Sequence, residues 1–96
     1  MTTIEKLREK KSQIFEVAAR HGVVGIYVFG SVARGDDRPD SDVDLLIAPG
    51  PSTSPWFPAG LVLDIESLLG RRVEVVTDRG LNPHLRDDVL KEAVSL

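Results

Sequence analysis

One stretch restricts the possible fold more than any other: an apolar run that ends in a Gly-Ser pair, followed by an acidic loop and two aspartates one residue apart. The apolar run is 23–29 (VVGIYVF), with a glycine on either side. Its near-continuous hydrophobicity predicts a strand covered on both faces, in a sheet packed between layers. The chain then turns at Gly30 and Ser31, where one short helical turn fits, and 42–48 (DVDLLIA) predicts a second strand.

The second strand brings two carboxylates together. Successive side chains of a strand point to opposite faces, so Asp42 and Asp44 share one face, about 6–7 Å apart along the strand. Two aspartates disfavour a strand unless something binds them. Glu74 interrupts the apolar run of a third predicted strand, 72–77 (RVEVVT), and is the available third carboxylate. Mg²⁺ prefers oxygen ligands, so the three predict a clamp for two Mg²⁺ ions on a triphosphate.

The Gly-Ser turn is a candidate phosphate site. Gly30 lets the backbone approach an anion with no side chain in the way, and Ser31 offers a hydroxyl. The amides that open the following helical turn point to the same place. Arg34 would add a positive charge for the triphosphate; the alternative is that it pairs with a loop aspartate. The loop aspartates themselves are expected to be solvated turn formers (Asp36, Asp37, Asp40).

A first helix is predicted from residues 4–20, where apolar side chains recur at helical spacing. Thr2 and Glu5 have the spacing of a capping box, and Gly22 is well placed to end the helix. His21, at this helix end, is expected to have a capping or surface role rather than a catalytic one.

Two further helices complete the expected order α-β-β-α-β-α. A loop at 49–58 leads to a helix that Pro58 opens and Gly70 closes. Trp56 and Phe57, in that loop, would either stack on a ligand or cover the core. The last helix has Asn82 and Pro83 as its cap and first residue. Its expected buried face consists of apolar residues (Leu85, Val89, Leu90, Ala93, Val94).

Composition excludes several classes of protein. A length of 96 residues fits one domain, residues 1–96, with a single modest core. Cysteine is absent, which rules out disulfide frameworks and thiolate metal sites. A net charge of −3 argues against broad nucleic-acid binding. The first residues are polar and no apolar run reaches membrane-spanning length, so a cytoplasmic protein is expected.

Taken together, the motifs resemble a known family. Gly30-Ser31, residues 33–36 (ARGD) and residues 41–45 (SDVDL) are similar to the signature of the minimal nucleotidyltransferases, in the DNA polymerase β nucleotidyltransferase superfamily. The resemblance continues through the Leu-rich helix, residues 70–73 (GRRV) and residues 81–96, and so covers most of the chain. It implies an α/β (α+β) nucleotidyltransferase fold, in which helices flank a small mixed β-sheet.

The resemblance also implies an activity: Mg²⁺-dependent transfer of a nucleoside monophosphate, AMP from ATP, to a hydroxyl. By position, Asp42 and Asp44 would be metal ligands, and Gly30 with Ser31 would bind phosphate. The family most often has Asp at the third acidic position, where this chain has Glu74. Glu is one methylene longer, so it can still reach a metal or accept the acceptor's proton, with a different geometry.

The implied partner is a second protein. Small members often resemble antitoxins of two-gene pairs whose toxin is an all-helical, ribonuclease-like protein of the HEPN class, and the acceptor would be a tyrosine on it. The chain lacks room for the extra domain of larger relatives, so a partner or a dimer would complete the site. Two alternatives stay open: a non-catalytic module that neutralises a helical partner by contact, and transfer to RNA or a small molecule.

Overall fold

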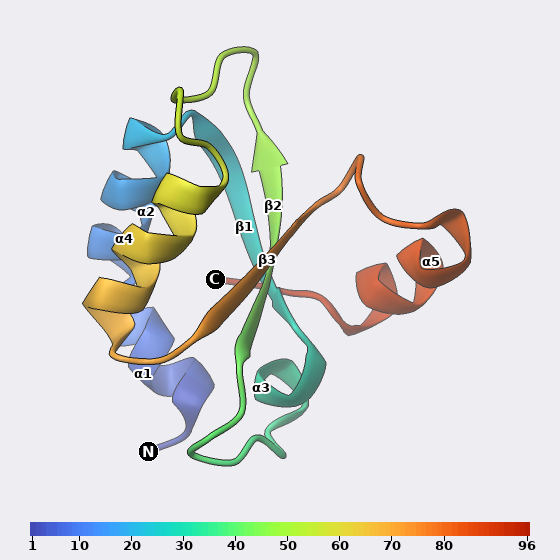
Figure 1. The fold of residues 1–96 in the computed structure, drawn as a ribbon. Helices are drawn as coiled ribbons and strands as arrows, with labels where there is room; N and C mark the ends of the chain where they lie inside the picture. The colour runs from blue at the N-terminus through green and yellow to red at the C-terminus, as the bar shows by residue number, and fades with distance from the viewer.

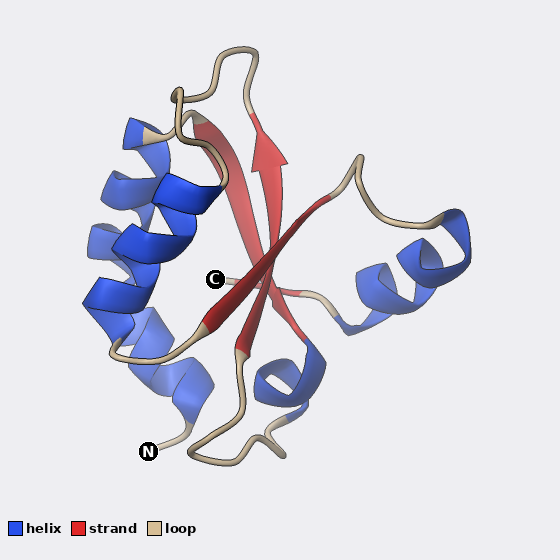
Figure 2. Ribbon diagram, viewed as in Figure 1, coloured by secondary structure: helices blue, strands red, loops and turns tan.

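The computed structural model describes residues 1–96 and contains one four-stranded β-sheet with helices on both sides (Figure 2). The strands are β1 (Val23–Phe29), β2 (Val43–Pro49), β3 (Val73–Thr77) and β4 (Val94–Ser95). The helices are α1 (Thr3–Glu9), α2 (Lys11–Arg20), α3 (Gly30–Arg34), α4 (Ala59–Leu69) and α5 (Pro83–Glu92). The longest, α4, has 11 residues, and none of the helices combines the length and apolar composition needed to cross a membrane.

The sheet is mixed, with strand order β3-β2-β1-β4. β1 runs antiparallel to β2 and β4, whereas β2 and β3 are parallel and are connected through α4, as a parallel pair requires a crossover. Phe29 pairs with Asp44, and Asp44 pairs with Glu74, so these three residues form one row across the sheet. The next row on the same face contains Tyr27 and Leu46. The predicted mixed sheet flanked by helices is confirmed.

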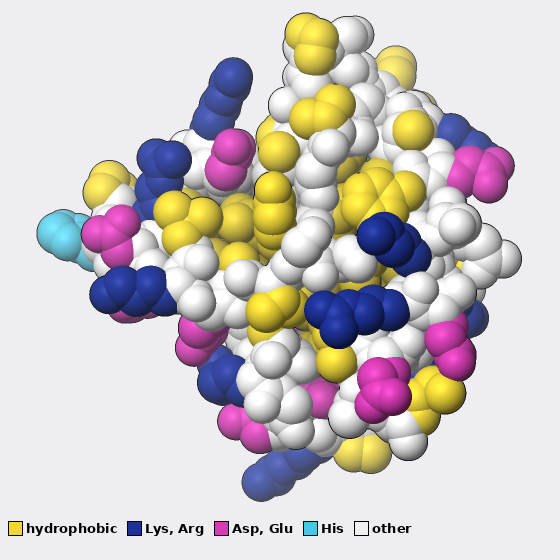
Figure 3. Space-filling model, turned by 180° about the vertical axis from the view of Figure 1, so that it is seen from behind, with side chains coloured by type: hydrophobic (Ala, Val, Ile, Leu, Met, Phe, Trp, Pro, Cys, Tyr) yellow, Lys and Arg dark blue, Asp and Glu magenta, His cyan; other side chains and the backbone are white.

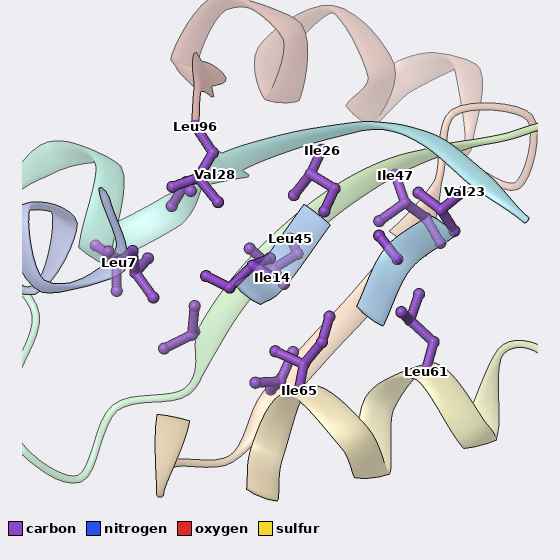
Figure 4. Packing of buried hydrophobic residues seen from close by; sticks show 14 residues of the cluster. Leu7, Ile14, Val23, Ile26, Val28, Leu45, Ile47, Leu61, Ile65 and Leu96 are labelled. Atoms are coloured by element: carbon purple, nitrogen blue, oxygen red, sulfur yellow. The ribbon is translucent and has the colours of Figure 1, made fainter. Parts of the chain in front are cut away.

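The hydrophobic core fills the space between the sheet and the layer formed by α1, α2 and α4 (Figure 1). Leu61 and Ile65 of α4 point toward the sheet, where they meet Leu45 and Ile47 of β2 (Figure 4). All four side chains are at most 2% exposed. This packing holds the backbone of β2 in place, so the alternate side chains of the strand, including Asp44, lie on the opposite face.

That opposite face is largely open, so the expectation of a strand covered on both faces is wrong. Val24 and Tyr27 of β1 are 70% and 41% exposed. α5 is the helix on this side, and it buries none of its residues; Leu85 and Leu90, expected inside, are 57% and 48% exposed. Hydrophobic side chains are also exposed between charged ones in the view from behind (Figure 3). α5 leaves these side chains exposed, so it does not complete a second covering layer on this face.

The predicted first helix is two helices, divided at Lys10. The capping box of Thr2 and Glu5 is present. The backbone N–H of Lys10 donates to the carbonyl of Leu7, and its Nζ donates to the carbonyl of Leu68 in α4. The apolar spacing did not reveal this turn, because both segments still bury residues on the same side. Gly22, with φ of 82°, follows the end of α2 as expected.

The end of the chain also departs from the prediction. Val94 was expected on the last helix, but it belongs to β4 and pairs with Val28. The chain leaves the helix at Ala93, whose backbone is extended (φ −63°, ψ 131°), and Leu96 is then buried in the core. The two residues of β4 pair with Val28 and Tyr27, and Leu96 follows them into the core.

Candidate active site

The three predicted carboxylates gather at one end of the open face. Asp44 is the second residue of β2 and Glu74 the second of β3, and they are register partners in the parallel pair. Asp42 lies one residue before β2 rather than inside it. The fold of two adjacent parallel strands therefore brings together residues that are 30 positions apart in the sequence.

The protonation of Asp44 reflects this crowding. Burial, the negative charges of Glu74 and Asp42, and hydrogen bonding of the protonated Asp44 carboxyl to Glu74 together raise the pKa of Asp44 to about 6. The positive charge of Arg34 acts in the opposite direction. An acidic side chain with its pKa raised by burial and by like charges is typical of a functional site.

Asp42 forms an ion pair with Arg72. Its Oδ1 lies 3.1 Å from Nε of Arg72, and the two side chains are 40% and 79% exposed. This close approach is an ion pair but not a hydrogen bond, because the same buried oxygen has no hydrogen-bond partner. Arg72 therefore pairs with Asp42 and not with Glu74, which lies beside Asp44 in what we call the acidic row.

Gly30 brings the turn against the acidic row. Its φ is 72°, in the left-handed region that favours glycine, and a Cβ at this position would collide with Oδ2 of Asp44. Gly30 also begins α3, which is the short helical turn that the sequence predicted. Ser31 follows it and is half-buried. The backbone of the turn and the carboxylate of Asp44 are therefore in direct contact, which only glycine permits.

Arg34 ends the same short helix and is shared between two carboxylates. Its Nε lies 3.3 Å from Asp36 and its Nη1 lies 3.0 Å from Glu92 in α5. The hydrogen bond to Glu92 and then that to Asp36 raise the pKa of the guanidinium. The alternative pairing with a loop aspartate is therefore present, and Arg34 nevertheless remains close enough to Asp44 to lower its pKa.

The donor set suits a hard cation. Three carboxylates lie close together; Asp42 has a buried oxygen without a hydrogen bond and Asp44 has a raised pKa, and a bound divalent ion would relieve both conditions. No group of three or more His, Cys, Asp or Glu side chains is already arranged around a single metal position in the structure. The chemistry of the residues fits Mg²⁺, while their side chains are not yet in a ligand arrangement.

The loop before Asp42 is fixed by a network that the sequence did not indicate. Asp37 accepts a hydrogen bond of 2.6 Å from Thr3 Oγ1 and one of 3.3 Å from Arg71 Nη1. Arg71 Nη2 also donates to the carbonyls of Arg38 and Ser41. The Asp37 side chain is only 10% exposed, and the Thr3 hydrogen bond and Arg71 lower its pKa. The expectation that Asp37 is solvated is wrong, because it anchors the loop to α1 and to the connection between α4 and β3.

The concave surfaces of the molecule do not coincide with the acidic row. All three pockets open around Arg71, and none is lined by Asp42, Asp44 or Glu74. The carboxylates lie on the open face of the sheet, outside these pockets. A ligand bound there would be exposed on one side.

His21 and the aromatic pair Trp56 and Phe57 were the other residues for which the sequence suggested a role. His21 is 12% exposed at the end of α2; Nδ1 lies 2.7 Å from Ser54 Oγ and Nε2 lies 2.7 Å from Asp64. It thereby connects the loop before α4 to both α2 and α4, and at 12% exposed it is less exposed than a surface role implies. Phe57 packs against the core, whereas Trp56 is 79% exposed and does not cover it.

Comparison with known proteins gives a consistent result. Residues 4–96 match the family model of the nucleotidyltransferase domain. A protein of Methanocaldococcus jannaschii with the provisional name protein adenylyltransferase MJ0435 is 34% identical, over 94% of this chain and 97% of its own. The protein adenylyltransferase MntA of Thermococcus cleftensis is 39% identical, over 82% of this chain and 80% of its own.

Solved structures share the fold. One provisionally described as a minimal nucleotidyltransferase is 48% identical, with a TM-score of 0.85 over 100% of this chain and 97% of its own. A toxin-antitoxin structure with AMP-PNP is 21% identical, with a TM-score of 0.74 over 88% of this chain and 70% of that one. These similarities extend over almost the whole of the present chain.

Proposed function

This chain belongs to the nucleotidyltransferase domain family, and from that premise we propose that it transfers AMP from ATP to a hydroxyl group of another protein. The observation that carries the proposal is the acidic row, in which Asp44 adjoins Glu74 on the open face and touches Gly30. The two archaeal relatives named as protein adenylyltransferases support AMP as the transferred group and protein as the acceptor.

The reaction forms one bond to phosphorus and breaks another. The acceptor oxygen attacks the α-phosphorus of ATP, and the bond from that phosphorus to the oxygen that bridges to the β-phosphate breaks. Pyrophosphate leaves with the electron pair, and the acceptor proton passes to a carboxylate. Glu74 suits this last role because it is exposed at the edge of the row and its side chain is one methylene longer than that of Asp.

The remaining residues bind and orient the triphosphate. The backbone at Gly30 and the hydroxyl of Ser31 would contact phosphate oxygens, and Arg34 would supply positive charge from the same turn. Two Mg²⁺ ions, held by Asp42, Asp44 and Glu74, would neutralise the triphosphate charge that these residues alone cannot balance.

The acceptor that we propose is a tyrosine of a small helical toxin of the HEPN type, with this chain as its antitoxin. The carboxylates lie on an exposed sheet face and not in a pocket, so an acceptor protein can approach them directly. The shared fold with a toxin-antitoxin structure is compatible with this role. A second copy of this chain is the other molecule that could cover the open face.

A second candidate function is neutralisation by contact alone. Two observations favour it: no group of acidic side chains is prearranged around a metal position, and Glu stands where the family most often has Asp. In this case the fold would serve as a binding surface, and the chain would transfer AMP slowly or not at all.

Co-expression separates the two functions. The test pairs this chain with a candidate small helical toxin, sought in the neighbouring reading frames, and measures growth. Neutralisation of toxicity that is lost in the Asp42→Asn/Asp44→Asn double variant supports transfer of AMP. Neutralisation that is equal in the two forms, with a stable complex in both, would assign the chain to the contact mechanism. An absence of any toxic neighbour would contradict the antitoxin role while leaving nucleotidyl transfer to be measured directly.

A further inference from the structure

Arg34 connects the phosphate turn to the last helix. Its Nη1 donates a hydrogen bond of 3.0 Å to Oε1 of Glu92, although 58 positions separate the two residues in the sequence. Its Nε lies 3.3 Å from Asp36, which is only two residues away. Asp36 therefore belongs to the same local segment as Arg34, whereas Glu92 lies in a different element, at the C-terminal end of α5.

The position of the guanidinium matters because Arg34 also acts on the acidic row. It is close enough to Asp44 for its charge to oppose the effects of burial and of Glu74. Arg34 thus interacts with two acidic groups. One is the acidic row, where we propose that the triphosphate binds, and the other is Glu92. A carboxylate and a phosphate oxygen accept hydrogen bonds from the same guanidinium nitrogens, so they are alternative partners.

We propose that Glu92 competes with the triphosphate for Arg34 and thereby sets the affinity of this chain for nucleotide; the inference rests on the proposed function. Glu92 is 40% exposed and Arg34 is 49% exposed, and ion pairs of such exposure are weak. A triphosphate offers several acceptor oxygens and a larger negative charge, so it displaces Glu92 from Nη1. Asp36 keeps its contact with Nε, so the guanidinium stays in the turn.

The exchange couples nucleotide binding to α5. This helix buries none of its residues, and the Arg34–Glu92 pair is its one ion pair to the rest of the chain. Displacement of Glu92 therefore loosens the attachment of α5 to α3. By reciprocity of binding energies, a molecule that draws α5 away from α3 strengthens nucleotide binding by the same factor.

The test is the dissociation constant of ATP in the presence of Mg²⁺. Glu92→Gln keeps the side-chain size and removes the competing charge, so we expect affinity to rise about two- to five-fold, the range of an exposed ion pair. Asp88→Asn is the matched control, since it removes one charge from an exposed residue of α5 that pairs with no cation. Tripolyphosphate, which has no nucleoside, should show the same ratio between the Glu92 variant and wild type.

A double-variant comparison shows whether the effect passes through Arg34. In an Arg34→Ala background, Glu92→Gln should leave the affinity unchanged, because the residue for which the two ligands compete is gone. Thermal unfolding of each variant, with Glu92→Ala as a second substitution, controls for loss of folding. Equal affinity of wild type and both Glu92 variants, or a rise that persists without Arg34, would overturn the inference alone. A wild-type chain that binds no ATP would contradict the proposed function itself.

Discussion

Asp44 of β2 and Glu74 of β3 are register partners in the parallel half of the sheet, and their side chains lie on its open face. Burial and the charge of Glu74 together raise the pKa of Asp44 to about 6. A fold does not gain stability by placing two carboxylates side by side. The arrangement costs free energy in the absence of a cation, which is the usual situation of catalytic carboxylates.

Asp44→Asn should therefore stabilise the chain at neutral pH. Because the folded-state pKa is raised, no penalty exists below the unfolded value of 3.8, and the penalty grows as pH rises to about 6. We expect a gain of about 1–2 kcal/mol at pH 7, allowing for screening by solvent, and almost none at pH 4. Urea unfolding between pH 4 and 7 measures it, and a gain that does not vary with pH would contradict the account.

Glu74→Gln should slow transfer of AMP by on the order of 100-fold, as expected for removal of a proton acceptor. The same change removes the neighbouring negative charge, so the pKa of Asp44 should fall toward its ordinary value. Labelled-product formation measures the first effect, and titration of the Asp44 carboxyl by NMR measures the second. Glu74→Asp is the control that restores the charge. A Gln variant with full activity would remove Glu74 from the proposed reaction.

Gly30→Ala and Gly35→Ala separate backbone strain from contact with the acidic row. Both glycines have positive φ, 72° and 80°, so either substitution should cost about 1–3 kcal/mol of stability. Only at Gly30 would the new Cβ meet the Asp44 carboxylate; at Gly35 it would enter open space. Gly30→Ala should therefore also abolish ATP binding, whereas Gly35→Ala should retain it. Equal nucleotide affinity in the two variants would show that the turn does not shape the site.

Asp37→Asn should destabilise the chain by about 1–3 kcal/mol, because it weakens a largely buried pair with Arg71 and Thr3. The pKa of Asp37 is lowered, so this stability is present above the unfolded pKa and is lost as pH falls toward acid. Asp40→Asn, in the same loop but exposed, is the control and should change stability by less than about 0.5 kcal/mol. Thermal unfolding compares them, and equal unfolding temperatures would remove Asp37 as the anchor of the loop.

Local sequence signals predicted the elements that carry the site. The apolar run ending at Phe29, the capping box of Thr2, and the alternation around Asp44 each depend on neighbouring residues, and each is present in the structure. The acidic row was also predictable from local signals, because assigning residues 72–77 to a strand was enough to make Glu74 the third carboxylate.

The remaining features depend on residues distant in the sequence. Asp37 meets Arg71 across 34 positions, and Arg34 meets Glu92 across 58, and neither pair has a periodic signature. The prediction that helices cover both faces of the sheet was wrong at Tyr27, which is 41% exposed, for a related reason. Hydrophobicity indicates which residues can be buried, whereas the number and placement of helices determine which of them are.

We propose that this chain transfers AMP from ATP to a protein hydroxyl and that the transfer depends on Asp42 and Asp44. The most direct measurement is incubation of the purified chain with α-labelled ATP, Mg²⁺ and its candidate helical partner, with Asp42→Asn/Asp44→Asn in parallel. The account predicts label on a tyrosine of the helical protein with the wild-type chain and none with the double variant. Complex formation by both forms without any label would contradict it and leave neutralisation by contact as the function.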